Sequence, residues 1–253
     1  MLCKHHFSKN GQVFFHIFWV VTLIMQSRYH NVIRQQNLLT TAFFRVYLVC
    51  GFVSLMISLT GLNNMSSTDF SPENLMTTIF PRHLIFCGLI PTYLLGLLPA
   101  IQIRPQDILL YQSRKIVSLQ VLYRVCFTML PMAIIWGFAN ILVLSVNGYL
   151  NFWGDLWLPI LIRAVYLWIA VFLLGLITVM LAIATKSKLI AFFISFGINS
   201  LSFTFVISRR PSLFFDFSTL DSNAALISKG IIMLGIALLM VPLMTFIVNR
   251  RDI

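Results

Sequence analysis

Six long apolar runs constrain the fold of this chain more than any other feature. Each run is close to the roughly 20 residues that an α-helix needs, at about 1.5 Å per residue, to cross a hydrocarbon core roughly 30 Å thick. Lipid offers no partner for backbone polar groups, so such runs must form helices. The sequence therefore predicts an all-α integral membrane protein with six transmembrane helices. The runs lie at residues 41–62, 83–103, 124–147, 158–184, 189–207 and 227–248.

The composition also indicates a membrane protein. Of the 253 residues, 59% are hydrophobic and 10% are charged, whereas soluble domains hold about 25% charged residues. In a soluble chain the formal net charge of +11 would indicate nucleic acid as a partner. Here we expect the basic residues to hold loops in the cytoplasm and to contact anionic membrane lipid. We predict an N-terminal cytoplasmic or interfacial segment at 1–40 and one transmembrane domain at 41–253.

The distribution of basic residues predicts the orientation of the six spans. If the amino terminus is inside, 13 of the 18 lysines and arginines fall on the cytoplasmic side and five fall outside. The positive-inside rule favours that arrangement, so we expect a multi-pass protein of the cell membrane with both termini cytoplasmic. The inner residues are Lys4, Lys9, Arg28, Arg34, Arg45, Arg104, Arg114, Lys115, Arg124, Lys186, Lys188, Arg250 and Arg251. The outer residues are Arg82, Arg163, Arg209, Arg210 and Lys229.

Residues 13–25, VFFHIFWVVTLIM, form an apolar run that is too short to cross a bilayer. A short basic head precedes the run, as in a signal peptide, but no small-x-small cleavage site follows it. We expect an uncleaved interfacial helix that continues into 26–37, with Arg28 and Arg34 among the headgroups. A true translation start at Met25 is the open alternative.

Common catalytic and nucleotide-binding motifs are absent from the sequence. There is no P-loop, no H-E-x-x-H and no G-x-S-x-G, and no set of metal ligands with zinc spacing. We therefore expect a chain that is not an enzyme and that holds no cofactor. No Asp or Glu lies in the six runs, which disfavours a proton- or sodium-coupled carrier. An intramembrane enzyme is disfavoured too, because the one histidine at a span, His83, has no obvious catalytic partner.

The candidate polar residues in the middle of the spans are uncharged asparagines and serines. Asn140 in the third run and Asn199 and Ser200 in the fifth are candidates for a polar strip along a solute pathway. The simpler interpretation, which we favour, is interhelical hydrogen bonding worth about 0.6 kcal/mol per bond.

The segment 104–115 is the longest internal cytoplasmic segment. A proline near its start, an acid in its first turn and basic residues near its end predict a short helix whose dipole is complemented. Its apolar residues could dock on a partner, or the helix could lie on the membrane surface. The candidate coupling residues are Pro105, Asp107, Ile108, Leu109, Tyr111, Arg114 and Lys115.

The segment 208–226 is too long for a tight turn and too apolar for a free loop. We expect a re-entrant or interfacial cap over the outer end of the pathway, with a structured gate as its function. The arginines of this segment, Arg209 and Arg210, could meet lipid phosphates or pair with Asp216 and Asp221. Arg163 in the fourth run could snorkel to the headgroups, which would keep its charge out of the hydrocarbon, and it could form a weak pair with Asp155. The candidate gate residues are Arg209, Arg210, Phe214, Phe215 and Asp216.

The whole layout resembles a permease subunit of a type-2 ABC exporter. The features that carry the resemblance are the run at 13–37, the six spans, RPQDILLYQSRKI at 104–116, the segment 208–226 and the terminal NRRDI. Two features depart from the family: a more apolar start, and no acidic residue beside the basic ones of the amino-terminal helix. The resemblance implies a separately encoded cytoplasmic ATPase as partner, a homo- or heterodimer of permeases, and a hydrophobic or amphipathic solute such as a peptide. A membrane immunity or sensor protein that sequesters a peptide would fit the same layout.

Overall fold

The computed structural model describes residues 41–63, 72–100, 114–148, 153–210, 212, 214–218 and 222–250. The chain divides into two compact units, Met1–Phe44 and Arg45–Ile253. All regular structure in the described residues is helical, and six helical stretches are long and apolar enough to cross a membrane. The predicted fold class is confirmed at this level. The predicted interfacial helix at 13–37 lies outside the described residues.

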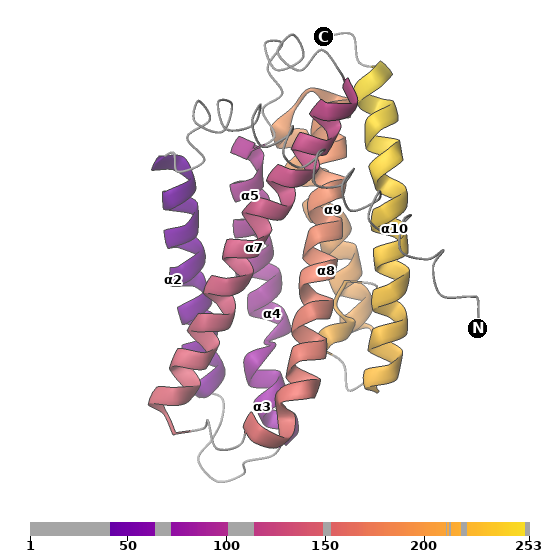
Figure 1. The fold of residues 1–253 in the computed structure, drawn as a ribbon. Coiled ribbons are helices and arrows are strands. Elements are labelled where there is room, and N and C mark those ends of the chain that lie inside the picture. Colours follow the sequence, from indigo (N-terminus) through magenta and orange to yellow (C-terminus); the bar gives the residue numbers. More distant parts are fainter. Residues whose placement is uncertain are drawn as a thin grey trace, which may run out of the picture. The chain divides into compact units, whose positions relative to one another are not determined.

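Each of the six predicted apolar runs corresponds to one helical span (Figure 1). Five of them match the predicted runs closely, whereas the second begins at Leu75 and not at 83. The helices are α2 (Thr41–Asn63), α3 (Pro72–Ile79), α4 (Arg82–Leu84), the π-helix η1 (Ile85–Leu89), α5 (Ile90–Ala100), α7 (Arg114–Val146), α8 (Trp153–Thr185), α9 (Lys188–Ile207), the 3-10 helix η3 (Asp216–Ser218) and α10 (Asn223–Arg250).

The second span is built from several short helices because prolines interrupt it. Pro81 precedes α4 in an extended conformation, which separates α3 from α4. Pro91 has no N–H to donate to the preceding turn, and the helix widens there into η1, where the Ile90 N–H donates to the Ile85 carbonyl. The Thr92 hydroxyl donates to the Gly88 carbonyl at 2.7 Å and satisfies a second carbonyl of this wide turn.

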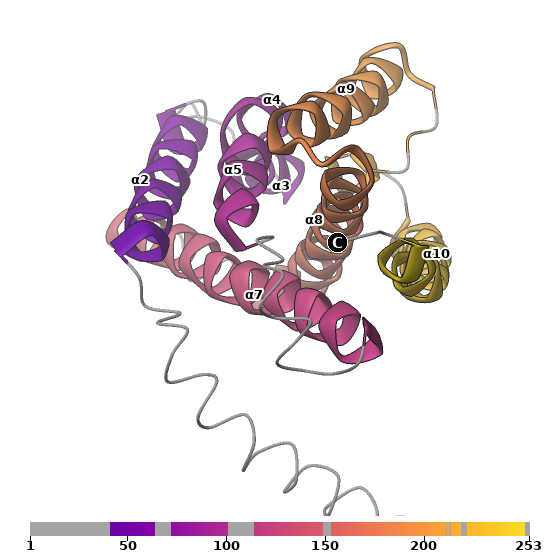
Figure 2. The same cartoon turned by 90° about the horizontal axis from the view of Figure 1, so that it is seen from above.

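Helix α8 lies at the centre of the second unit. It contacts α5, α7, α9, α10 and η3, and the view along the helices shows these helices around it (Figure 2). In the α8 span 67% of residues are buried, against 22–39% in the other five. A helix that is apolar on all sides is expected at such a position. The remaining spans each keep an exposed apolar face, as helices in contact with lipid do.

Helix α2 packs on its neighbours through a close approach and a polar contact. A Cβ at Gly61 would lie 2.5 Å from the carbonyl oxygen of Thr78, so only glycine lets α2 come this near to the α3 backbone. The Ser58 hydroxyl donates to Asn140 Oδ1 of α7 at 3.0 Å. The first span is therefore fixed to α3 by the close approach at Gly61 and to α7 by the hydrogen bond of Ser58.

Successive spans run in opposite directions, so the bundle has two ends. We call the end that holds the tight α8–α9 turn at Lys186 and Ser187 the turn end. Helix α5 finishes and helix α7 begins at the same end (Figure 1). The other we call the cap end, because the chain between α9 and α10 lies there. The turn is closed by Ser187, whose hydroxyl accepts from the Ile190 N–H and caps α9.

Candidate functional site

At the cap end, α9 stops in a Schellman turn. The Arg210 N–H donates to the Phe205 carbonyl at 2.8 Å and the Arg209 N–H donates to the Val206 carbonyl at 3.1 Å. Arg209 adopts a left-handed conformation with φ of 54°. Glycine usually occupies this position, and another residue there costs roughly 1–2 kcal/mol. The side chains of Arg209 and Arg210 are exposed.

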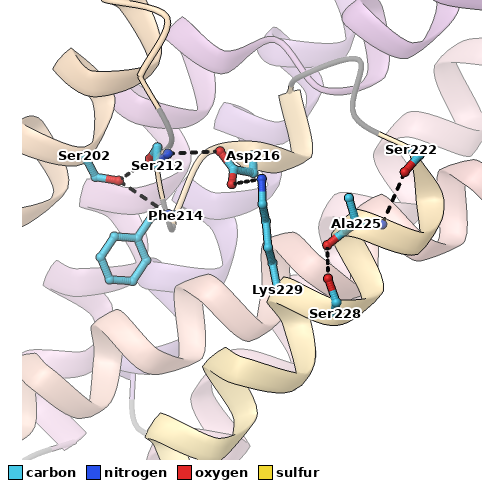
Figure 3. Close-up of polar contacts among 8 residues, drawn as sticks. All are labelled: Ser202, Ser212, Phe214, Asp216, Ser222, Ala225, Ser228 and Lys229. Carbon is cyan, nitrogen blue, oxygen red and sulfur yellow. Dashed lines mark hydrogen bonds and ion pairs between the residues drawn. The ribbon is translucent and has the colours of Figure 1, made fainter.

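Beyond this turn the chain folds back onto α9. We call residues 212 and 214–218 the cap. The hydroxyls of Ser202 on α9 and Ser212 form a hydrogen bond, with their Oγ atoms 2.6 Å apart. The Phe214 N–H donates to the same Ser202 Oγ at 3.4 Å (Figure 3). The Ser212 N–H donates to Asp216 Oδ1 at 3.3 Å. A single serine of the fifth span thus anchors the first half of the cap.

An ion pair joins the cap to α10. Lys229 Nζ lies 2.7 Å from Asp216 Oδ2, and the Asp216 side chain is almost completely buried (Figure 3). The expectation that Arg209 or Arg210 would pair with Asp216 is wrong, because those side chains point to the exposed surface while Lys229 reaches the carboxylate. The other predicted acid, Asp221, lies outside the described residues.

Arg163 joins the cap to α8. Its Nη1 donates to the Phe217 carbonyl at 2.8 Å, and the residue is only 8% exposed. The expectation that Arg163 snorkels to the headgroups is therefore wrong. The guanidinium of Arg163 does not need to reach the headgroups, because it donates a charge-assisted hydrogen bond to the Phe217 carbonyl of the cap. The Asp155 side chain lies outside the described part, so its predicted pairing is untested.

Aromatic side chains fill the space beneath the cap. Phe214, Phe215 and Phe217 are buried, so protein covers the apolar residues that made a free loop improbable. The Phe215 ring lies 5.3 Å from Phe203 of α9, and Phe203 in turn stacks on Phe86 of η1 at 4.3 Å. Such pairs contribute beyond their buried area. The cap is thus a packed layer on the ends of the second, fourth, fifth and sixth spans, and its re-entrant or interfacial position in a membrane stays a prediction.

The three pathway candidates do not form one site. Asn140 is buried, accepts from Ser58 as described, and donates through Nδ2 to the Trp136 carbonyl. Ser200 donates to the carbonyl one turn earlier, at Phe196. Asn199 is fully buried, and neither its Oδ1 nor its Nδ2 has a hydrogen-bond partner among the described residues. Asn199 is therefore the one candidate whose polar atoms remain available for a ligand, a water or a second conformation.

Two of the coupling candidates fall at the turn end. Arg114 and Lys115 form the first residues of α7, although their side chains are not among those described. The predicted coupling helix at 104–115 otherwise stays untested, because the remaining candidates lie outside the described residues. These are Pro105, Asp107, Ile108, Leu109 and Tyr111.

Sequence reasoning missed the anchors of the cap. Ser202, Ser212 and Lys229 each form a bond that fixes the cap, yet serine and lysine at span boundaries are common and predict no particular partner. Arg163 offered the clearest signal, because a charge inside a span is costly and normally has a partner. Of the predicted gate residues, Phe214, Phe215 and Asp216 are buried in the cap, and their role as a gate stays a prediction.

No protein-family model, curated protein or solved structure matches this chain.

Proposed function

We propose that this chain is the permease subunit of an ATP-driven ABC exporter that moves a hydrophobic or amphipathic solute, such as a peptide, across the cell membrane. The observation that carries the proposal is that six candidate spans contain no Asp or Glu. Carriers driven by protons or sodium ions usually place ionisable groups at mid-membrane. Energy from a separately encoded cytoplasmic ATPase fits spans of this composition.

The shape of α7 supports a coupling role for the turn end. α7 begins at Arg114, whereas the span that it forms begins at Val121. At about 1.5 Å per residue, the first two turns project roughly 10 Å beyond the hydrocarbon. An ATPase that moves the segment 104–115 would thus push directly on a helix that contacts α5, α8 and α10. In this proposal the turn end and both termini are cytoplasmic.

Helix α10 provides a physical connection from α7 to the cap. Near the turn end, Ser118 Oγ of α7 and Thr245 Oγ1 of α10 lie 3.1 Å apart. Near the cap end, Lys229 of the same helix holds Asp216. A rigid helix with a polar contact at each end can transmit a shift of α7 to the cap. We propose that this shift weakens the Arg163, Ser202 and Lys229 contacts and opens the outer gate to the solute.

By resemblance, two such permeases, identical or different, form the pathway between them. The exposed apolar faces of the spans are available both to a second permease and to lipid. Asn199 is the pathway residue that we retain from the sequence-based candidates, because its amide has no partner within the described residues.

Co-purification tests the proposal. The chain is co-expressed with an ABC ATPase encoded by a neighbouring gene, and association and ATPase stimulation are measured. We expect the wild-type chain to retain the ATPase and the double variant Arg114→Glu with Lys115→Glu to lose both association and stimulation. Retention of both by the double variant would contradict the role of segment 104–115.

A matched control sits at the same end of the molecule. Lys186 and Lys188 flank the α8–α9 turn and are exposed, so Lys186→Glu with Lys188→Glu reverses the same amount of charge outside the proposed coupling segment. We expect this variant to keep the ATPase. If the wild-type chain never associates with an ATPase but binds a peptide without nucleotide, the permease proposal fails and sequestration becomes the function.

A further inference from the structure

We propose that the end of α9 binds the phosphate of an anionic lipid headgroup through Arg209 and Arg210, with one acyl chain along the apolar stripe that leads up to them. The site does not depend on the export proposal. It follows from three observations at the cap end: exposed arginines that contact no carboxylate among the described side chains, a strained arginine, and an exposed apolar track of the length of one leaflet.

Three arginines at the cap end are exposed and contact no carboxylate among the described side chains. Arg82, Arg209 and Arg210 are all exposed. Among the side chains described at this end, Asp216 is the one carboxylate, and Lys229 already occupies it. His83, the residue after Arg82, contacts α9, and its ring lies 5.2 Å from the ring of Phe203.

The conformation of Arg209 argues that its side chain has a use. The left-handed position at the end of α9 favours glycine, which has no Cβ to clash, yet arginine stands there with φ of 54°. Its side chain is exposed, and within the described part of the chain it makes no polar contact that would repay the strain. A ligand outside the protein accounts for an arginine at this position, and the guanidinium matches the geometry of a phosphate.

The apolar stripe on α9 has the dimensions of an acyl chain. Phe193, Leu201 and Phe205 are 66%, 64% and 45% exposed, and together with Gly197 they recur every fourth residue, in a row inclined to the helix axis. A Cβ at Gly197 would meet nothing within 4 Å, so the stripe has an open notch. From Phe193 to Phe205 the helix rises about 18 Å, close to half of the roughly 30 Å hydrocarbon core.

Charge and stripe together favour a lipid as the source of the phosphate. An apolar face by itself indicates only bulk lipid, and arginines by themselves could hold a free phosphate. Here the stripe ends at the turn that contains Arg209, one helical turn beyond Phe205. A molecule with an acyl chain and a phosphate at its head fits both parts at once.

Thermal unfolding of the purified full-length chain in nanodiscs tests the site. One set of nanodiscs contains phosphatidylcholine alone, and the other contains an equimolar mixture with phosphatidylglycerol. We expect phosphatidylglycerol to raise the midpoint of the wild-type chain. Arg209→Gly should unfold roughly 2–4 °C higher than wild type in phosphatidylcholine, because the strain is relieved, yet it should lose most of the rise caused by phosphatidylglycerol. Arg209→Gln should also lose the rise caused by phosphatidylglycerol, but its midpoint in phosphatidylcholine should stay at the wild-type value because the backbone strain remains.

Lys186→Gly is the matched control. Lys186 is also an exposed basic residue with positive φ, 57°, but lies at the turn end. It should gain stability in the same way and keep the full response to phosphatidylglycerol. Equal loss of the response in Lys186→Gly, or an undiminished response in Arg209→Gly, would overturn the site. So would an equal rise of the wild-type midpoint when inorganic phosphate is added to phosphatidylcholine nanodiscs, because the ligand would then be a free phosphate.

Discussion

Lys229 of α10 reaches a carboxylate, Asp216, that lies 13 positions earlier in the chain and is almost completely buried, with Nζ 2.7 Å from Oδ2. The pair joins the last span to the cap. Lys229 is 31% exposed at its side chain, so solvent weakens the pair relative to a fully buried one. The pair is nevertheless a direct contact between opposite charges that joins the cap to α10.

Removing the carboxylate charge should loosen the cap. Asp216→Asn removes the negative charge that Lys229 contacts, and we expect a loss of about 1–3 kcal/mol in the free energy of unfolding, below the value for fully buried pairs. Thermal or denaturant unfolding in detergent micelles measures it. The double variant Asp216→Leu with Lys229→Met should recover part of the loss, because neither charge then needs a partner. An unchanged stability of Asp216→Asn would show that the pair does not hold the cap.

Arg163→Leu should expose the cap to solvent exchange. The variant removes the donor of the Phe217 carbonyl and leaves a buried acceptor unsatisfied, at a cost of about 1.5–3 kcal/mol for a charged donor. If the cap opens by that amount more readily, its amides should exchange hydrogen roughly 10- to 100-fold faster. Hydrogen exchange of peptides that cover 212–218 provides the measurement. Lys188→Leu, at the turn end, should leave these rates unchanged, and equal rates in the two variants would contradict the anchor role of Arg163.

Gly61→Ala should separate α2 from α3. The added methyl would lie 2.5 Å from the carbonyl oxygen of Thr78, which belongs to the backbone and cannot rotate away. We expect a loss of about 1–3 kcal/mol, as for other insertions into a packed core, seen as a lower unfolding midpoint. Gly137→Ala is the control, because a Cβ there meets nothing within 4 Å and alanine favours the helix. A loss of the same size in Gly137→Ala would show that the close approach is not the cause.

Two buried asparagines should respond in opposite ways. Asn140→Leu removes the bond to Ser58 and should lower the free energy of unfolding by about 1 kcal/mol or less, with no effect on export, because Ser58 still donates to the Ser54 carbonyl. Asn199→Leu removes two buried polar atoms without partners in the described residues. It should raise the stability by about 1–3 kcal/mol and reduce export. Unchanged export in Asn199→Leu would remove this residue from the pathway.

The spans were predictable because their length and composition leave one solution in a membrane, and the exceptions are local. The start of the second span was placed too late because Pro81, Arg82 and His83 look like a boundary in the sequence, whereas the apolar residues before them form α3 and pack inward. Hydropathy counts residues and does not register a helix that is interrupted at a proline and resumes.

The partners of the charged residues were not predictable from the sequence. Asp216 has two arginines six and seven positions before it, yet it pairs with the more distant Lys229. Arg163 bonds to a carbonyl 54 positions away. Charge type and sequence distance do not reveal these choices, because they depend on how α8, α9 and α10 converge at the cap end. The burial of Phe214, Phe215 and Phe217 was predictable, since three phenylalanines in so short a segment need cover.

The wide turn η1 has a consequence for the face that α5 presents. An α-helix rotates about 100° per residue, so the extra residue of a π turn offsets the orientation of everything that follows it. In the present phase Tyr93 of α5 points its hydroxyl at Gly175 of α8, so close that a Cβ on Gly175 would lie 2.5 Å from it. Deletion of one residue from 85–89 would restore regular winding and turn Tyr93 toward a different helix. The π turn therefore sets the angular phase in which the second span meets the central helix.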